Sequence, residues 1–340
     1  MSPSVIVAPH FRSMEEIFRP EALDLLGSFA EIVWGVDGPM PQDRFEAALE
    51  DATAVVFGTW HYGESLVEGG PNVRAVLEVA GAHDHHGVGY SECFARGIEV
   101  GGAAHAFGAA VAELTLGLTL AATRGIAAND RDFRSGSELW LHEGNVGYNT
   151  LFDKVVGFVG CGGLSVDLQN LLDPFRARIL GFDPFLPDEA MEARGIEQTD
   201  LPTLFRSSDV VYVLAAPTAT SRGMIDRDLL ELLEPLQTLI MTSRAALVDF
   251  DALTELVAEG RFRLGIDVFP EEPVPADHPL RTAESAVLSS HRAGAVPDAL
   301  LAIGDMVVAD LEDIITNRGE RRMQYLTPES LESLLQPRRD

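Results

Sequence analysis

Short apolar runs alternate with longer amphipathic stretches through most of the chain. Most of these runs lack an alternation of polar and apolar positions, which is typical of strands covered by helices on both faces. We expect strands at 4–9, 31–34, 54–58, 73–79, 154–160, 177–183, 209–215, 238–243, 262–269 and 286–290. Helical spacing marks the stretches at 14–27, 226–234 and 249–260. This β/α rhythm predicts parallel sheets in a doubly wound α/β architecture.

Two further helical patterns bracket the strands of the middle part of the chain. One begins near Gly108 and leads through a polar stretch at 129–153 to the strand at 154–160. The other, at 297–315, follows the last strand and His291. A chain that leaves one domain near residue 106 and returns to it near 294 would make the N-terminal domain discontinuous.

The charge balance excludes some classes of partner. The chain has 53 Asp and Glu against 25 Lys and Arg, a net charge of −28. Such a field repels nucleic-acid phosphates and anionic lipid, so we expect no nucleic-acid and no membrane partner. An anionic ligand can bind only where local donors overcome that field. Apolar residues make up 46% of the chain, which is enough for a packed core.

Cysteine content and the apolar runs predict the compartment. Cys93 and Cys161 cannot build a disulfide framework, which indicates a reducing compartment. The first residues lack the basic and long apolar regions of a signal peptide. The longest apolar run, at 109–122, is interrupted by polar residues, and we interpret it as a buried helix too short to span a bilayer. We therefore expect a cytoplasmic protein.

A glycine-rich turn follows the strand at 154–160. Gly160 would permit a tight turn, and Gly162 would let backbone N–H groups approach a pyrophosphate at the start of the next helix. Ser165 stands where a third glycine is usual. The following strand ends in Asp183, 21 residues past Gly162. A carboxylate there accepts the ribose hydroxyls and repels a 2′-phosphate, so the pair predicts NAD rather than NADP as the cofactor.

Polar residues follow three further apolar strands. Arg244 comes directly after the strand at 238–243, and we expect it at a buried edge, where it would need an anion. Glu272 and His291 follow the next two strands. The carboxyl ends of parallel strands line one crevice. Arg244 could bind a carboxylate there, beside Glu272 and His291 acting as a proton-transfer pair. Taken singly, Arg244 also fits a surface ion pair, Glu272 a solvated loop acid and His291 a capping histidine.

A family resemblance rests on motifs that stand in order along the chain. They are AVAELTLGL, GFVGCGGLS, FDP, SSDVVYVLAAPTATSRGMID, LIMTSRAALVDFDAL, GIDVFPEEP and SSHRAGA. Together they resemble the D-isomer-specific 2-hydroxyacid dehydrogenases, specifically from about 109 to 294 and more weakly before and after. The resemblance implies a Rossmann-type NAD-binding domain, residues 107–294. It would be inserted into a flavodoxin-like substrate domain formed by residues 1–106 and 295–340.

The resemblance also implies site residues. The catalytic set would be Arg244, Glu272 and His291, with Asp183 on the adenosine ribose and Asp267 near the nicotinamide. The other cofactor-binding positions that it implies are Gly160, Gly162, Gly163, Leu164, Ala216, Pro217 and Thr242. For the substrate carboxylate we expect Ala82 and His83 beside Arg244. Family members are usually dimers formed through the cofactor domain, which predicts a homodimer.

The function that follows is a reversible hydride transfer between C4 of nicotinamide and C2 of a 2-oxo or 2-hydroxy acid. His291 would be the acid and base, Glu272 would fix its tautomer, and Arg244 would hold the substrate carboxylate. Two alternatives stay open. One is a dehydrogenase of a phosphonate- or phosphite-type anion, and the other is a non-catalytic NAD-sensing protein of the same fold. The presence of all three catalytic residues favours an enzyme.

Three smaller features allow more than one interpretation. His83, Asp84, His85 and His86 form a dense cluster, but consecutive residues seldom direct their side chains to one ion, so we expect no metal site. The cluster fits a loop of the substrate pocket or a solvated loop. Trp60 and His61 could line the substrate pocket, pack in the core or lie in an exposed loop. Cys161 fits a small buried filler, with redox sensitivity as the alternative.

Overall fold

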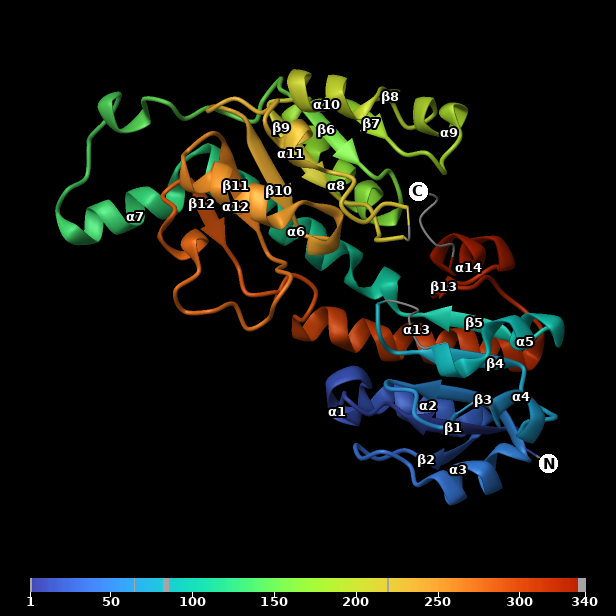
Figure 1. Cartoon of the computed structure of the whole chain (residues 1–340). Helices are drawn as coiled ribbons and strands as arrows, with labels where there is room; N and C mark the ends of the chain where they lie inside the picture. The colour runs from blue at the N-terminus through green and yellow to red at the C-terminus, as the bar shows by residue number, and fades with distance from the viewer. Residues whose placement is uncertain (1, 64, 82–85, 219, 336–340) are drawn as a thin grey trace. The chain divides into compact units, whose positions relative to one another are not determined.

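The computed structural model describes residues 2–63, 65–81, 86–218 and 220–335. The chain forms two compact units, which Figure 1 colours along the sequence. Within the described residues, unit 1 consists of residues 2–107 and Gly294–Leu335, and unit 2 is Gly108–Ala293. Each unit has one sheet and its own apolar core. The chain therefore passes from unit 1 into unit 2 and back again.

The sheet of unit 1 has the strand order β13-β5-β4-β3-β1-β2. Its strands are β1 (Ser4–Ala8), β2 (Glu31–Trp34), β3 (Ala52–Phe57), β4 (Ala75–Glu78), β5 (Glu99–Gly102) and β13 (Gln324–Tyr325). Only β13 pairs antiparallel. Because β2 and β3 lie on opposite sides of β1, the order of connections reverses at β1, as in flavodoxin-like folds.

Helices cover both faces of this sheet. They are α1 (Met14–Ile17), α2 (Pro20–Phe29), α3 (Gln42–Leu49), α4 (Ser65–Gly69), α5 (Tyr90–Ala95), α13 (Pro297–Thr316) and α14 (Pro328–Leu335). Val5 and Val7 of β1 pack in one core cluster with α13, whereas Ile6 packs in another with Phe45 of α3. Successive strand residues point to opposite faces, so an unbroken apolar run serves both cores.

The sheet of unit 2 is entirely parallel, with the order β12-β11-β10-β9-β6-β7-β8. Its strands are β6 (Val155–Val159), β7 (Arg178–Phe182), β8 (Ile196–Gln198), β9 (Val210–Val213), β10 (Thr238–Met241), β11 (Arg263–Ile266) and β12 (Ala286–Leu288). The first six in chain order are arranged 3-2-1-4-5-6, the Rossmann order. The two-domain architecture predicted from the β/α rhythm and the resemblance is confirmed.

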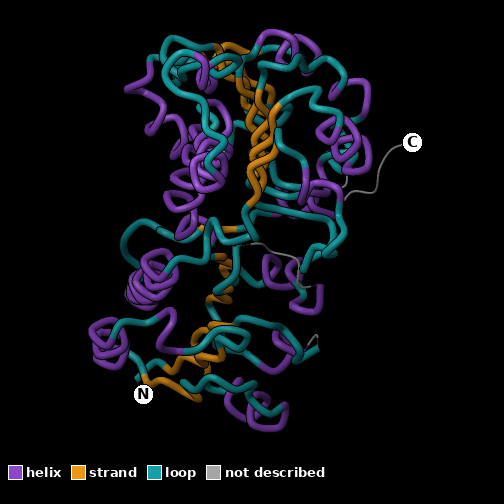
Figure 2. Tube along the Cα trace, turned by 90° about the vertical axis from the view of Figure 1, so that its left-hand side faces the viewer, coloured by secondary structure: helices purple, strands orange, loops and turns teal. Residues whose placement is uncertain are grey.

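Helices lie on both sides of this second sheet, as Figure 2 shows. They are α6 (Ala104–Thr123), which begins in unit 1, α7 (Ile126–Ser135), α8 (Gly163–Leu172), α9 (Asp188–Glu192), α10 (Leu201–Ser207), α11 (Arg227–Leu230) and α12 (Phe250–Ala258). Short 3-10 turns complete the chain, at His86–Val88, Glu143–Asn145, Asp173–Phe175, Ala245–Leu247 and Pro279–Thr282.

Every strand expected from the sequence is present, but three others were missed. β5 has the sequence EVGG, β8 is three residues long and β13 only two, so none has an apolar run of its own. The expected helix at 14–27 is two helices, because Pro20 cannot continue a helix and Arg19 before it is extended. Of the expected helix at 226–234, only Arg227–Leu230 is α-helical.

The apolar helix α6 is longer than its sequence suggested. At 20 residues it is long and apolar enough, by length and composition alone, to cross a membrane, so the expectation that it is too short was wrong. Its buried side chains contribute to the core of unit 2. Thr119 of α6 donates a hydrogen bond to Tyr212 of β9, and Ala112 and Leu118 pack beside that strand. These contacts indicate a core helix.

Candidate active site

The carboxyl ends of the unit 2 strands carry all the described residues predicted for catalysis or cofactor binding. Because the strands are parallel, these ends lie along one edge of the sheet. β6 leads to Gly160, Gly162, Gly163 and Leu164; β7 to Asp183; β9 to Ala216 and Pro217; β10 to Thr242 and Arg244; β11 to Asp267 and Glu272; and β12 to His291. Residues far apart in the sequence thus share one edge.

The turn after β6 can cradle a phosphate. Gly160 has φ +93°, and a Cβ there would lie 2.5 Å from the backbone of Ala215, so only glycine fits. At Gly162, the N-cap of α8, an added Cβ would meet no described atom within 4 Å. Packing within the protein does not require this glycine, but close approach of a pyrophosphate does. The described residues supply no side-chain cap for α8, so its first N–H groups are available to an anion.

Asp183 lies against the same turn. Its Oδ2 accepts a hydrogen bond from the backbone N–H of Cys161 at 2.8 Å. Its Oδ1 accepts from the backbone N–H groups of Phe185 and Leu186 at 2.9 and 3.2 Å. The half-buried carboxylate is therefore held beside the glycine turn, where an acid in this fold accepts ribose hydroxyls.

A hydrogen-bonded serine replaces the third glycine of the usual turn. Ser165 is fully buried, and its hydroxyl donates to the carbonyl of Gly162 at 2.6 Å. Arg194 donates to the Ser165 hydroxyl at 2.8 Å and to the carbonyl of Cys161 at 2.6 Å. The Arg194 guanidinium thus binds both ends of the turn, at Cys161 and at Ser165. Sequence reasoning missed Arg194, because it follows α9 and no local pattern connects it to the turn.

Cys161 packs its side chain into the core beneath the turn. Burial, together with the negative charge of Asp183, raises the pKa of the Cys161 thiol to about 12. The thiol therefore stays protonated and poorly nucleophilic at neutral pH. This environment fits the interpretation of Cys161 as a small filler.

The end of β9 borders the glycine turn, and the end of β10 follows next along the sheet edge. The backbone N–H of Ala215 donates to the carbonyl of Val159 at 2.9 Å, and Ala216 and Pro217 continue from there. Thr242 is buried, and its Oγ1 lies 2.7 Å from Oγ1 of Thr115 in α6. The Thr242 side chain is therefore engaged with the protein.

Asp267 positions His291, the histidine predicted to act as acid and base. It is fully buried, and its carboxylate accepts the backbone N–H groups of Arg292 at 3.0 Å and Ala293 at 3.1 Å. Its carbonyl accepts the N–H of His291 at 2.8 Å. These bonds stabilise a turn in which His291 has φ +51°, a conformation that residues with a Cβ rarely adopt. Asp267 thus holds the strained backbone from which the imidazole projects.

His291 and Glu272 form a hydrogen-bonded pair. The Nδ1 of His291 lies 2.7 Å from Oε2 of Glu272, and Oε1 of Glu272 accepts the backbone N–H of Phe269 at 3.0 Å. Burial would raise the pKa of Glu272. The hydrogen bonds from His291 and Phe269, with the charges of His291 and Arg244, outweigh burial and leave that pKa below its ordinary value. An ionised carboxylate only accepts, so Nδ1 carries a proton and Nε2 is left for proton exchange.

Arg244 is exposed, so the expectation of a buried-edge arginine was wrong. Its Nη1 donates to the carbonyl of Ser243 at 2.8 Å, and its charge acts on Glu272. Among the described residues, no carboxylate forms an ion pair with Arg244. The guanidinium is therefore oriented by the backbone, with donors left for a carboxylate ligand.

The predicted substrate residues of unit 1 are only partly described. Ala82 and His83, with Asp84 and His85, lie outside the described residues. Trp60 packs in the core against Phe45 and Phe57, which decides between the interpretations of this residue. His61 is exposed.

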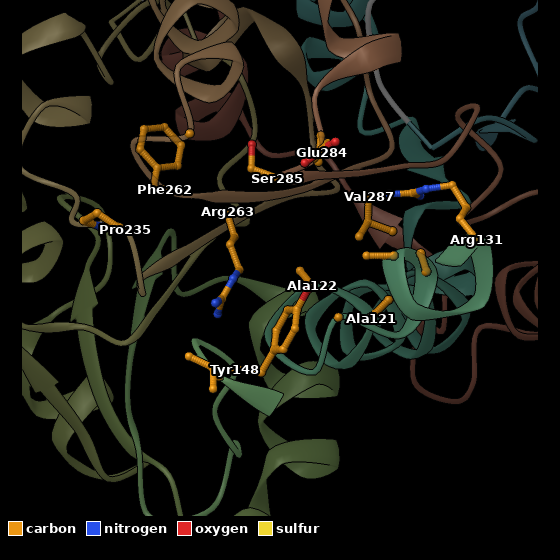
Figure 3. A pocket seen from close by; sticks show the side chains of 16 residues that line it. Ala121, Ala122, Arg131, Tyr148, Pro235, Phe262, Arg263, Glu284, Ser285 and Val287 are labelled. Carbon is orange, nitrogen blue, oxygen red and sulfur yellow. The ribbon is translucent and has the colours of Figure 1, made fainter. Parts of the chain in front are cut away.

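A cavity of about 270 Å³ lies away from this edge (Figure 3). Arg263, the first residue of β11, reaches across it, donates to the carbonyl of Gly147 and lies 4.9 Å from the ring centre of Tyr148. Gly125 has φ +63° and no room for a side chain beside Tyr148. These contacts anchor the segment after α7 to the amino end of the sheet.

Comparison with known proteins identifies the family. A family model described as "D-isomer specific 2-hydroxyacid dehydrogenase, NAD binding domain" matches residues 116–293, within unit 2. The chain belongs to this family. The expected enzyme class, an oxidoreductase using a nicotinamide cofactor, is confirmed with it, and the glycine turn beside Asp183 fits such a cofactor.

Relatives with known names carry different activities. A glyoxylate reductase of Thermofilum pendens is 31% identical, over 75% of both chains. A D-3-phosphoglycerate dehydrogenase of Methanocaldococcus jannaschii is 31% identical over 66% of this chain, which spans only 42% of that protein. The crystal structure of a phosphoglycerate oxidoreductase from Rhizobium etli superposes with a TM-score of 0.85 at 34% identity, covering 96% of this chain and 98% of that one.

Proposed function

We propose that the protein reversibly reduces a 2-oxo acid to a 2-hydroxy acid with NADH. The observation that carries the proposal is the short hydrogen bond between His291 and Glu272, on the same sheet edge as Arg244 and the glycine turn. The names of the relatives support this reaction class, since they include glyoxylate reductases and phosphoglycerate dehydrogenases. When bound, the nicotinamide supplies the hydride to C2 in reduction and accepts it in oxidation.

Each residue of the set has one task in this proposal. Arg244 binds the substrate carboxylate through its planar guanidinium and orients the 2-oxo group. His291 gives the proton on Nε2 to the carbonyl oxygen during reduction and takes it back from the hydroxyl during oxidation. Glu272 accepts from Nδ1 and keeps the ring in the tautomer and orientation that this transfer needs. Asp267 holds the backbone turn beneath the ring.

A spectrophotometric assay tests the function directly. NADH oxidation would be followed with glyoxylate, pyruvate, hydroxypyruvate and phenylpyruvate, and NAD reduction with phosphite. Turnover with a 2-oxo acid supports the proposal. Turnover with phosphite alone would favour the phosphite-type dehydrogenase, and NADH binding without turnover of any of these compounds would favour an NAD-sensing protein.

The Asp183→Ser variant tests cofactor choice. We expect it to lose most of the preference for NADH over NADPH, because a serine neither pairs with the ribose diol nor repels a 2′-phosphate. The measurement is the ratio of kcat/KM for the two cofactors. Asp188→Ser is a matched control, because it removes the same charge in α9. An unchanged ratio in Asp183→Ser would mean that the ribose contact lies elsewhere.

We also propose that the protein is a homodimer formed through the segment at 126–152, the arm. Figure 1 shows α7 and the loop after it projecting from the sheet of unit 2. The arm exposes large apolar side chains, among them Leu139 at 62%, Trp140 at 64% and Leu141 at 86%. Exposed apolar groups in such a contiguous set mark an interaction surface, and a second copy of the chain presents the same apolar arm.

The Leu141→Asp variant is expected to weaken this dimer, because it would bury a charge within the apolar interface. Sedimentation velocity would show a dimer for the wild type and a larger monomer fraction for the variant at the same concentration. Leu236→Asp, which alters an exposed leucine outside the arm, is the control. A wild-type monomer, or equal dissociation in both variants, would argue against the arm as the interface.

A further inference from the structure

The glycine turn after β6 has a buried serine where a third glycine usually allows a helix to pack closely on its strand. Ser165 is fully buried, so its hydroxyl needs partners within the protein. The hydroxyl donates to the carbonyl of Gly162 at 2.6 Å and accepts from Arg194 at 2.8 Å. The buried group is thus satisfied both as a donor and as an acceptor, and the arginine provides the second contact.

The hydrogen bonds of Ser165 and Arg194 fix the orientation of two consecutive peptide groups. The carbonyl of Cys161 accepts from Nη1 of Arg194 at 2.6 Å, and the carbonyl of Gly162 accepts from the Ser165 hydroxyl. The C=O and N–H of one planar trans peptide point in opposite directions. The N–H groups of Gly162 and Gly163 are therefore directed away from these contacts.

These two N–H groups are available to an anion. Neither donates a hydrogen bond to another described residue, and the first N–H groups of a helix have no partner within it. A Cβ at Gly162 would meet no described atom within 4 Å, so the space beside the turn is open. The N–H groups and the dipole of α8 both attract negative charge to this position.

The backbone of Arg194 is held in place for its contact with the turn. Arg194 lies between α9 and β8, after the fully buried Met191 and before Gly195, which has φ +70°. The carbonyl of Arg194 accepts from Nε2 of Gln169 in α8 at 2.6 Å. Arg194 is thus tied through its backbone to the same helix whose first turn its side chain contacts, so little additional freedom is lost when the guanidinium binds there.

No described carboxylate accepts a hydrogen bond from Arg194. Its acceptors are the carbonyl of Cys161, the hydroxyl of Ser165 and, at 3.5 Å, the amide oxygen of Gln169, all of which are neutral. Burial and the charge of Asp183 raise the pKa of the Cys161 thiol, and the charge of Arg194 lowers it, so this charge acts on the turn. In a chain with a net charge of −28, a positive charge behind the turn reduces the repulsion of a pyrophosphate.

We propose that Arg194 is a positioning residue for the pyrophosphate of the cofactor, and that with Ser165 it replaces the third glycine of the turn. Its role is indirect. It holds the carbonyl of Cys161 so that the N–H of Gly162 is presented to the phosphate, and it supplies positive charge behind the turn. The inference rests on the nicotinamide cofactor and not on the proposed 2-oxo acid, so binding rather than turnover tests it.

The test compares Arg194→Met with Arg178→Met. Arg178 begins β7 and donates to Glu197, so this control removes the same charge at the end of β7 opposite the glycine turn. NADH binding would be followed by fluorescence, and the binding of ADP-ribose and of adenosine by calorimetry. ADP-ribose contains the pyrophosphate and adenosine has no phosphate, so the two ligands separate the turn from the rest of the site. Circular dichroism would check folding.

We expect Arg194→Met to raise Kd for NADH and ADP-ribose about 10-fold, the effect of losing one charge-assisted hydrogen bond, and to leave Kd for adenosine unchanged. Arg194→Lys keeps the charge but lacks the planar fork that holds two acceptors, so it should recover part of the affinity. Kd values for Arg194→Met that equal those for Arg178→Met would overturn the positioning role. An equal loss for ADP-ribose and adenosine would also overturn it, since that is the result of a general structural defect.

Ser165→Gly tests the replacement of the third glycine. Glycine removes the buried hydroxyl that Arg194 satisfies, so Arg194→Met should raise Kd for ADP-ribose by a smaller factor in the Ser165→Gly background than in the wild type. Equal factors in both backgrounds would overturn the pairing of the two residues. If the wild type binds NADH but turns over no 2-oxo acid, the proposed function fails, and these binding measurements still decide the role of Arg194.

Discussion

Replacing His291 with asparagine is expected to lower kcat for 2-oxo acid reduction by about 10²- to 10⁴-fold, the usual contribution of a positioned acid–base group. Asparagine tolerates the positive φ at this position better than most residues, so the turn held by Asp267 should survive. The side chain, however, cannot give up a proton. Steady-state kinetics, with NADH binding followed by fluorescence, would show lost turnover and retained cofactor affinity.

Glu272→Gln is the companion variant, since it keeps the shape of the side chain and removes the charge. The pKa of Glu272 lies below its ordinary value, so the ionised carboxylate and its stabilisation are present at neutral pH and are lost only as the pH falls through the lowered value. The kcat ratio of wild type to Glu272→Gln should therefore stay constant from neutral pH into the acid range, then shrink. If the His291→Asn variant keeps the kcat of the wild type, His291 is not the general acid.

Replacing Arg244 with methionine is expected to lower kcat/KM by about 10²- to 10³-fold, as for the removal of a preorganised charged donor. KM should rise and kcat should fall, because the same contact binds the carboxylate and orients the 2-oxo group. Arg244 is exposed and pairs with no described carboxylate, so the thermal midpoint should change little. Kinetics with a 2-oxo acid and with the corresponding simple ketone would measure the effect.

Arg244→Lys is the matched control for the shape of the guanidinium. Lysine keeps the charge but loses the planar fork, so it should recover only part of the activity. The simple ketone has no carboxylate to bind, and its slow turnover should be the same in wild type and Arg244→Met. Equal kinetic constants for the 2-oxo acid in wild type and Arg244→Met would show that Arg244 does not bind the substrate carboxylate.

Much of the fold could be predicted because it depends on local patterns. The apolar runs that became β6, β9 and β10 are buried on both faces, so they carry almost no polar positions and stand out in the sequence. β8 and β13 could not be found in this way, since each is a short edge strand defined by its pairing with one neighbour and not by its own sequence. The length of α6 also depended on context, because its first turn belongs to unit 1 and contains few strong signals.

In the candidate site, too, some features depend on local sequence patterns and others on the tertiary structure. The order of glycine turn, Asp183, Arg244, Glu272 and His291 along the chain was enough to predict the family and the sheet edge. The role of Arg194 could not be predicted, because this guanidinium follows α9 and reaches the glycine turn only through the tertiary fold. The exposure of Arg244 and the two backbone hydrogen bonds to Asp267 were likewise set by the fold.

By itself, the sequence determined which chemical groups follow which strands, because strand burial and glycine requirements are local properties of the backbone. Only the tertiary structure decided how those groups are used. It paired His291 with Glu272, gave Asp267 the turn beneath them, and placed Arg194 against the glycine turn. Such pairings depend on side chains that meet across many intervening residues, and neither spacing nor periodicity records which donor finds which acceptor.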